Sequence, residues 1–161
     1  MANGTQWKPE RPWGAAEARE VLRAQGLRYS RPRRVILEYL SEQDRHLSAE
    51  ALHQALKERG EVLSLSTVYL NLGVLAEAGL VRGFSGPGGE ALYDSNPSEH
   101  YHLICSETGE VQDVAPPLID GQPLGAFLRS YVERQTGWVV DEPKVTLWGR
   151  PPPQGEVEPS D

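Results

Sequence analysis

Two histidines separated by one residue, His100 and His102, lie in the segment EHYHLIC. The segment has the pattern of a β-strand, and residues i and i+2 of a strand project from the same face. The spacing therefore presents two imidazoles together, as a bound metal ion requires. Taken alone, this signal is weak, because two surface histidines with this spacing are more often incidental.

Carboxylates lie on both sides of this pair in the sequence. Asp94 comes just before it, at the end of a predicted β-hairpin. Asp113 follows the turn SETGE, on a strand predicted to pair with the histidine strand, where it could approach the same face. His46 lies far away in the sequence, in the segment DRHLS, and no local pattern indicates where it points. Each added carboxylate favours a metal site over coincidence.

The first half of the chain reads as short helices followed by a hairpin. Residues 15–25 have helical spacing and stop at Gly26, a second helix begins near Ser30, and Ser48 caps a third that ends at Gly60. Ser66 is expected to cap a fourth helix, which stops at Gly79. The runs LVRGF and ALYD, joined by SGPGGE, predict a β-hairpin. This order is typical of a winged helix-turn-helix.

The spacing of the apolar residues changes in the second half of the chain. YHLIC and VQDV predict a strand pair, residues 123–137 predict an amphipathic helix, and VTLW predicts a closing strand. The fold class is therefore α+β, with an N-terminal winged helix-turn-helix and a small α+β dimerisation domain. We expect disordered ends at 1–13 and 150–161, a winged-helix domain with hinge over 14–94, and a dimerisation domain over 95–149.

Charge is distributed unevenly along the 161 residues, whose net charge is −7. Residues 1–85 carry 12 Lys and Arg against 10 Asp and Glu, whereas residues 86–161 carry 4 against 13. Four arginines fall within residues 28–34, a density suited to phosphate contacts. Taken alone, however, this density favours a solvated helix start. No apolar run approaches the length of a signal peptide or a membrane span, so we expect a cytoplasmic protein without membrane contacts.

Five stretches of the sequence, taken in order, form a pattern specific to one protein family. They are RYSRPRRVILEYL, HLSAEALHQAL, SLSTVYLNLGVLAEAGLV, LYDSNPSEHYHLIC and TGEVQDV. Over about residues 16–149 the chain resembles the ferric uptake regulator (Fur) family of metal-dependent bacterial repressors, most closely its peroxide-responsive branch. The resemblance implies a homodimer that binds double-stranded operator DNA and holds a regulatory metal at the hinge between its domains. It assigns that metal to His46, Asp94, His100, His102 and Asp113.

Three imidazoles and two carboxylates suit Mn²⁺ or Fe²⁺, and five ligands leave one position open at an octahedral ion. In the branch that the chain resembles, bound Fe²⁺ reacts with hydrogen peroxide and oxidises a ligand histidine, which releases metal and DNA. That branch has Asp at the position of Asp113, where iron sensors usually have Glu. The alternative within the family is a sensor of manganese or iron availability. Zinc sensing is less favoured, because no aligned ligand is a cysteine.

Cys105 is the only cysteine in the chain. Most of the family hold a structural zinc with two C-x-x-C pairs, and the first pair begins at the position of Cys105. Its partner position here is Thr108, and the second pair would fall near Pro151 and Gln154, so the structural zinc with four cysteine ligands is predicted to be absent. Cys105 then reads as a small buried apolar residue, and the dimerisation domain depends on an apolar core to which Trp138 and Trp148 contribute.

The resemblance also assigns DNA contacts. Ser66, Thr67 and Tyr69 match the family's DNA-facing helix, in which Leu70 and Gly73 replace the residues that relatives often carry. Arg28, Arg31 and Arg33 are predicted to meet phosphates. Two other classes stay open at this stage. A small metallo-hydrolase would explain the histidines but not the first half, and a winged-helix regulator of an organic ligand would leave the histidines incidental. We expect a repressor and not an enzyme.

Overall fold

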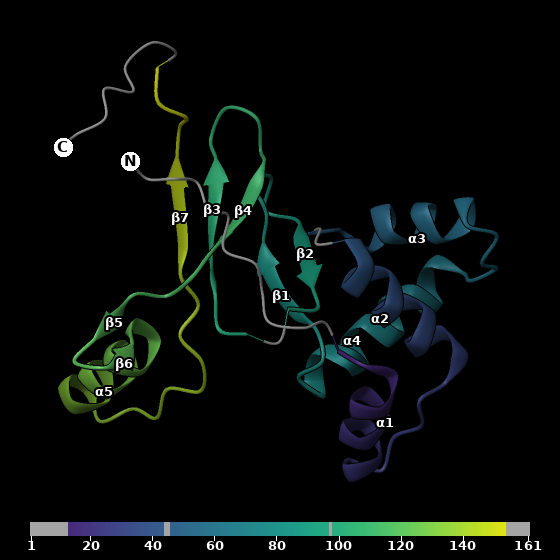
Figure 1. Cartoon of the computed structure of the whole chain (residues 1–161), viewed down its shortest axis with the longest axis horizontal. Helices are drawn as coiled ribbons and strands as arrows, with labels where there is room; N and C mark the ends of the chain where they lie inside the picture. Colours follow the sequence, from purple (N-terminus) through teal and green to yellow (C-terminus); the bar gives the residue numbers. More distant parts are fainter. Residues whose placement is uncertain (1–12, 44–45, 97, 154–161) are drawn as a thin grey trace. The chain divides into compact units, whose positions relative to one another are not determined.

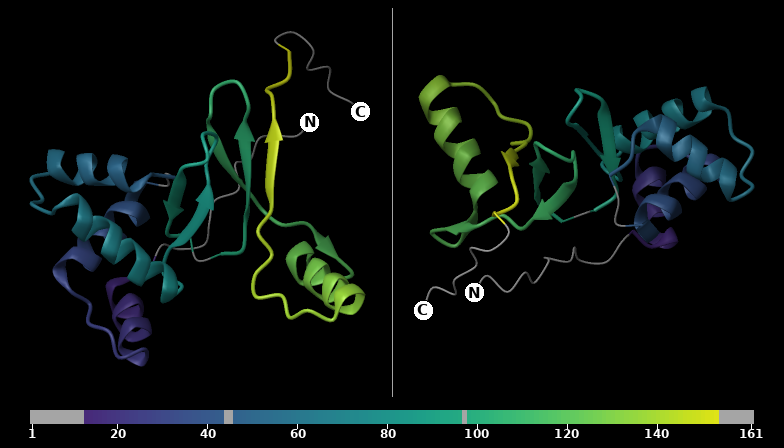
Figure 2. Two further views of the ribbon diagram at one scale, coloured as in Figure 1. Left: turned by 180° about the vertical axis from the view of Figure 1, so that it is seen from behind. Right: turned by 90° about the horizontal axis from the view of Figure 1, so that it is seen from above.

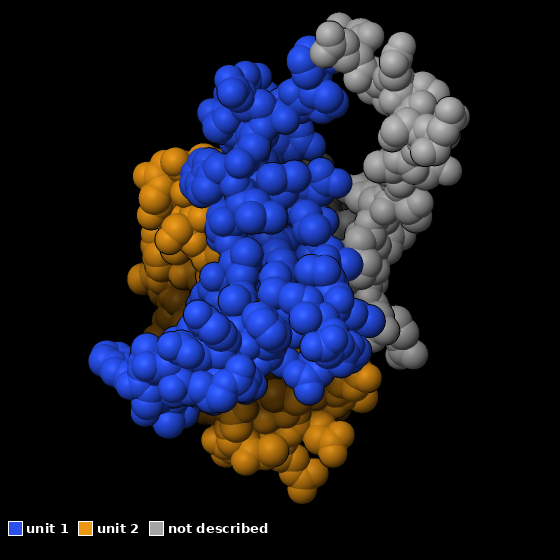
Figure 3. Space-filling model, turned by 90° about the vertical axis from the view of Figure 1, so that its left-hand side faces the viewer, with its two compact units in different colours: residues 1–8, 99–161 blue, residues 9–98 orange. Residues whose placement is uncertain are grey.

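The computed structural model describes residues 13–43, 46–96 and 98–153. The chain divides into two compact units, one within Pro9–Ser98 and one that includes Glu99–Asp161 (Figure 3). Apart from Trp13 and residues 150–153, the ends predicted to be disordered, 1–13 and 150–161, lie outside the described residues. The α+β class is confirmed, with helices in both units and small sheets beside them.

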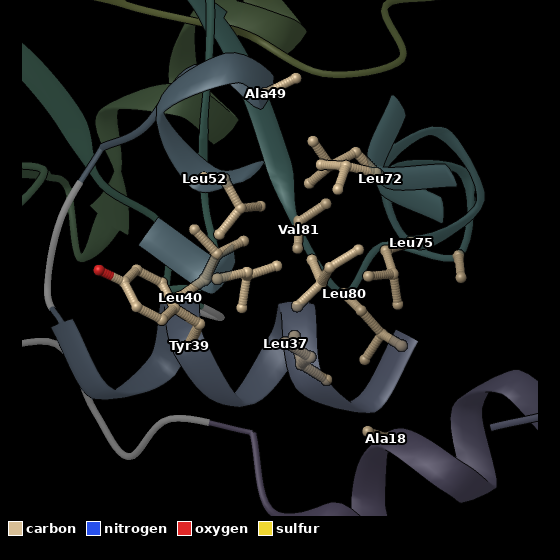
Figure 4. Close-up of a cluster of buried hydrophobic side chains, with 14 of the residues drawn as sticks. Ala18, Leu37, Tyr39, Leu40, Ala49, Leu52, Leu72, Leu75, Leu80 and Val81 are labelled. Carbon is tan, nitrogen blue, oxygen red and sulfur yellow. The ribbon is translucent and has the colours of Figure 1, made fainter. Parts of the chain in front are cut away.

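Four helices build the first unit: α1 (Ala15–Ala24), α2 (Arg31–Gln43), α3 (Ala49–Glu58) and α4 (Leu65–Glu77) (Figure 1). Each buries the apolar face that its helical spacing predicts. Leucines from all four helices belong to one cluster, which Leu80 and Val81 after α4 complete. Figure 4 labels leucines of α2, α3 and α4 in this cluster. The fully buried members of largest volume include Leu37, Leu52, Leu72, Leu75 and Leu80.

Serine side chains cap α3 and α4. Ser48 accepts a hydrogen bond from the backbone N–H of Ala51, as predicted. The cap of α4 is Ser64 and not Ser66, because the Ser64 hydroxyl accepts from the Thr67 N–H at 3.1 Å. The prediction placed this cap two residues too late, since both serines precede the apolar run. Gly79, with φ of 78°, ends the helix in a left-handed conformation.

The predicted hairpin is present as β1 (Arg82–Ser85) and β2 (Ala91–Asp94), which pair antiparallel with Arg82 opposite Asp94. One more segment joins this hairpin. Leu47 forms an isolated antiparallel bridge to Tyr93, with backbone hydrogen bonds of 3.2 and 2.9 Å. The segment after α2 is thereby fixed against β2.

The second unit contains a mixed three-stranded sheet in the order β4-β3-β7 (Figure 2). The strands β3 (Tyr101–Cys105) and β4 (Val111–Val114) are antiparallel, and β7 (Thr146–Gly149) lies parallel to β3. The predicted helix is α5 (Leu124–Thr136), which contacts the short hairpin of β5 (Leu118–Ile119) and β6 (Gln122–Pro123).

The second unit leaves most of its large apolar side chains exposed in the single chain. Of its described residues, Tyr101 and Ile104 are the buried large apolar ones, whereas Phe127, Tyr131 and Val132 of α5 are 38%, 49% and 39% exposed. The prediction that Trp138 and Trp148 contribute to a core is wrong for the single chain, because they are 77% and 54% exposed. Too few layers cover these residues within one chain to bury them.

Within the described residues, no helix has the length and apolar composition needed to cross a membrane.

Candidate metal centre and nucleic-acid interface

The first unit places His46 beside Asp94. The bridge between Leu47 and Tyr93 aligns the preceding residue, His46, with the residue after Tyr93, which is Asp94. The His46 Nε2 lies 3.8 Å from Asp94 Oδ2, and the imidazole packs edge-on against the Phe84 ring with centroids 5.3 Å apart. An imidazole and a carboxylate from segments 48 positions apart thus face each other.

Local hydrogen bonds orient the Asp94 carboxylate. Its Oδ1 accepts the backbone N–H of Asn96 at 3.0 Å, which closes a tight turn at the end of β2. The hydroxyls of Ser95 and Ser41 lie 3.2 Å apart and connect this turn to α2. With Oδ1 used in the turn, Oδ2 is the oxygen directed toward His46.

The second unit brings His100, His102 and Asp113 together. His102 and Asp113 are direct cross-strand partners of β3 and β4, as the sequence predicts. His100 lies just before β3 and not within it, yet its Nε2 lies 3.1 Å from the His102 Nε2. Asp113 Oδ1 is 3.7 Å from His100 Nε2 and 3.6 Å from His102 Nε2.

The ligand atoms of these three residues all lie within 4.8 Å of one another, and both histidines are buried. The two Nε2 atoms lie at hydrogen-bond distance, 3.1 Å, so one ring nitrogen donates and the other accepts. Neutral imidazole and carboxylate are the forms that bind divalent metals. The five predicted ligands therefore form two convergent groups, one in each unit.

The predicted DNA-facing helix presents part of its surface to solvent. Ser66 and Tyr69 of α4 are exposed and Thr67 is half-buried. The Tyr69 hydroxyl donates a hydrogen bond to the Glu50 carboxylate of α3. This bond raises the pKa of Tyr69 and lowers that of Glu50, because it favours the protonated phenol and the ionised carboxylate. Leu70 is 69% exposed beside them.

The three predicted arginine contacts differ in their surroundings. Arg28 is exposed, and Arg31 forms an exposed salt bridge with Glu61. Arg33 is directed inward. Its Nε donates to Asn71 Oδ1 at 3.2 Å and its Nη1 donates to the Arg28 carbonyl at 2.6 Å. A phosphate contact by Arg33 stays a prediction, whereas its bond between α2 and α4 is present in the fold.

Asn71 is a residue whose role the sequence analysis missed. Its side chain is buried, and its Nδ2 donates to the Thr67 carbonyl at 2.8 Å while Oδ1 accepts from Arg33. One signal was available, because Asn71 immediately precedes the buried Leu72 on an otherwise apolar helix face. A polar residue at such a position must find partners when it is buried.

Cys105 is half-buried at the end of β3, and not buried as predicted. Hydrogen bonding by the Thr108 side chain, followed by the backbone of Thr108 and Glu107, lowers the pKa of the Cys105 thiol. Thr108 occupies the position at which a second thiol would follow the first in a C-x-x-C pair. A hydroxyl there stabilises the thiolate but is a poor ligand for structural zinc.

Comparisons with known proteins agree with this arrangement. The sequence model of the ferric uptake regulator family matches residues 24–129. The chain belongs to the ferric uptake regulator family. It is 33% identical over 134 residues to the peroxide operon regulator of Bacillus subtilis, covering 83% of this chain and 88% of that protein. It is 44% identical over 92 residues to the ferric uptake regulation protein of Pseudomonas aeruginosa, covering 56% and 69%.

Solved structures of the family share the fold. The Pseudomonas aeruginosa ferric uptake regulator with manganese is similar with a TM-score of 0.60 and 33% identity, over 83% of this chain and 96% of that one. The Campylobacter jejuni peroxide stress regulator has a TM-score of 0.60 and 25% identity, over 82% and 90%. The chain is therefore a metal-responsive, DNA-binding transcriptional regulator and not an enzyme, so the metallo-hydrolase alternative is excluded.

Proposed function

We propose that this chain is a dimeric repressor whose DNA binding requires one Mn²⁺ or Fe²⁺ per chain, held by His46, Asp94, His100, His102 and Asp113. The observation that carries the proposal is the convergence of His100, His102 and Asp113, whose ligand atoms lie within 4.8 Å of one another. The pairing of His46 with Asp94 adds a second convergent group. A single ion that binds both groups uses all five residues.

The donor set fits such an ion. Imidazole nitrogens and carboxylate oxygens are borderline to hard ligands, and none of the five proposed ligands offers a soft thiolate. His100 and His102 are buried and their Nε2 atoms lie 3.1 Å apart, so both nitrogens can reach the same cation. The fit of these residues to Mn²⁺ or Fe²⁺ rests on this chemistry.

The division of the ligands explains how metal would control DNA binding. Two of the proposed ligands belong to the unit that contains α4, and three belong to the unit that contains β3 and β4. An ion that takes ligands from both units stabilises one arrangement of the two. If operator DNA binds the same arrangement, metal and DNA increase each other's affinity by the same factor.

The exposed apolar residues of the second unit support a homodimer. Phe127 and Tyr131 lie one turn apart on α5, with their rings stacked at a centroid distance of 6.4 Å. Leu147 and Trp148 on β7 add further exposed apolar surface in the same unit. Apolar area of this kind is characteristic of a surface that another protein covers, and a second copy of the chain is the proposed partner.

We further propose that peroxide is the physiological signal. The similarity to the peroxide operon regulator and the aspartate at position 113 support this proposal. When bound, Fe²⁺ would activate hydrogen peroxide. One peroxide oxygen would be inserted into a ring C–H bond of a histidine ligand, which would give up two electrons, and the other oxygen would leave as water. Loss of that histidine as a ligand would weaken the connection between the two units. Sensing of manganese or iron availability is the second candidate, favoured by the similarity to ferric uptake regulation proteins.

The test is peptide mass spectrometry on protein loaded with Fe²⁺ without oxygen and then given one equivalent of hydrogen peroxide. Protein loaded with Mn²⁺ is the control. We expect a gain of one oxygen on His46, His100 or His102 in the iron sample alone. If the histidines and Cys105 stay unmodified, the chain is a sensor of metal availability and not of peroxide.

A further inference from the structure

The exposed face of α4 carries an unusual set of residues for a surface helix. Ser66, Tyr69, Leu70 and Gly73 are spaced at i, i+3, i+4 and i+7, so they share one side of the helix. All four are exposed, and Leu70 with 69% exposure projects most of its side chain into solvent. The opposite side of α4 buries its apolar residues in the core. The exposed face is therefore available to a ligand.

Neither packing nor backbone conformation requires glycine at position 73. A Cβ built on Gly73 would meet nothing within 4 Å, and its φ is not in the left-handed region. Glycine is the least favourable residue after proline inside a helix. The fold alone would thus accept alanine and would be more stable with it. What glycine does provide at this position is a helix surface without a side chain, which a ligand can approach closely.

The near absence of charged residues on α4 limits the kinds of contact that this face can make with a ligand. Glu77 at the end of α4 is its one charged residue, and the helix has no lysine or arginine that could donate two hydrogen bonds to guanine. Basic residues of the same unit lie elsewhere, with Arg28 and Arg31 exposed before and at the start of α2. Attraction to the DNA phosphates is therefore assigned to the arginines near α2, and contact with the bases is assigned to α4.

We propose that Leu70 and Gly73 are specificity determinants that read thymine. Leu70 contacts the C5-methyl group of a thymine in the major groove, and the absence of a side chain at Gly73 lets the helix lie close enough for that contact. Apolar contact with this methyl group is a recognised means of distinguishing T·A from the other base pairs. The inference rests on the proposed function, since it assumes that α4 enters operator DNA.

The test begins with selection of binding sites from a randomised duplex library by the full chain loaded with Mn²⁺. Each thymine of the selected site is then replaced singly by deoxyuridine, which removes the methyl group and leaves the hydrogen-bonding edges unchanged. We expect at least one replacement to weaken DNA binding by about fourfold, because this is the change in affinity that corresponds to burial of one methyl group. That effect should disappear in Leu70→Asn and persist in Leu70→Met, a matched pair that differs in apolar character.

Gly73→Ala supplies an independent readout. We expect this variant to unfold at a higher urea concentration than the wild type and yet to bind the selected site more weakly. A variant that is both more stable and equally tight in DNA binding would overturn the role of Gly73. A variant that fails to fold is not expected, because the added methyl meets no neighbour.

The outcomes separate this inference from the function on which it rests. If Mn²⁺ increases DNA binding but no deoxyuridine replacement matters, the thymine contact is wrong and the metal-dependent repressor stands. If the deoxyuridine effect survives in Leu70→Asn, another residue such as Tyr69 reads the methyl group and the assignment to Leu70 fails. If no sequence is selected with or without metal, both the inference and the proposed function fail.

Discussion

His102 and Asp113 are direct partners on antiparallel strands, and their Nε2 and Oδ1 atoms lie 3.6 Å apart. This register brings a ligand imidazole and a ligand carboxylate together without any contribution from a loop. A one-residue shift of β4 would turn Asp113 to the other face of the sheet. Substitution of either residue therefore tests whether the second unit contributes metal ligands as proposed.

Replacement of His102 by Ala is expected to weaken Mn²⁺ binding by more than the roughly 10 to 100-fold that loss of a supporting residue costs a metal site. The reason is that a nitrogen ligand is removed outright. Isothermal titration with Mn²⁺ measures the effect. His53→Ala is the matched control, because His53 forms a hydrogen bond with the Leu63 carbonyl in the first unit and is not a proposed metal ligand. Equal loss in both variants would refute the assignment.

Chelation is expected to abolish DNA binding while leaving a folded dimer. The proposed ligands include no cysteine, and the single cysteine of the chain cannot form a zinc site of four thiolates. Circular dichroism and sedimentation velocity before and after treatment with EDTA measure folding and assembly. Restored DNA binding on addition of Mn²⁺ serves as the control. A chelated sample that melts or separates into monomers would show that metal supports the fold itself.

The exposed rings of α5 provide a test of the dimer. Replacing Tyr131 by Glu places a charge on apolar surface next to Phe127, so we expect the dimer to dissociate into folded monomers. Sedimentation velocity reports the change in mass. Arg134→Glu, near the exposed end of the same helix, controls for added negative charge. An unchanged dimer in Tyr131→Glu would place the interface elsewhere.

Arg33 and Arg34 are adjacent arginines with different partners, which makes them a matched pair. Arg33→Ala is expected to lower the free energy of unfolding by about 1 to 3 kcal/mol, because buried Asn71 loses a hydrogen-bond donor. Arg34→Ala removes an exposed pair with Glu38 and should cost less than about 0.5 kcal/mol. Urea unfolding of the two variants compares them. Equal costs would mean that the inward bonds of Arg33 contribute little to stability.

The thiol of Cys105 offers a pH-dependent measurement. Its pKa is lowered chiefly by the Thr108 hydroxyl, so the wild type contains more thiolate at a given pH below the normal thiol range. In Thr108→Val we expect the rate profile of iodoacetamide alkylation to shift to higher pH. Thr136→Val, which removes a hydroxyl bonded to the Val132 carbonyl, is the control. An unshifted profile would assign the lowered pKa to the backbone groups alone.

Much of the site follows from local patterns. The spacing of His100 and His102 and the turn before Asp113 predicted a shared face, and the structure brings the three side chains together. The helices and the hairpin were predictable for the same reason, because apolar periodicity, caps and turn residues act over a few positions. The cap of α4 was misplaced because Ser64 and Ser66 are equally good candidates in sequence and only the backbone geometry distinguishes them.

The sequence by itself determined the helix and strand order, the family resemblance and the residue types available to a metal. Tertiary structure decided the position of His46, since the bridge between Leu47 and Tyr93 that sets it beside Asp94 joins segments far apart in the chain. It also decided that Arg33 turns inward to Asn71 and that Trp138 stays exposed in the single chain. These positions depend on contacts between segments that are far apart in the sequence, and the periodicity of apolar residues does not indicate which segments make contact.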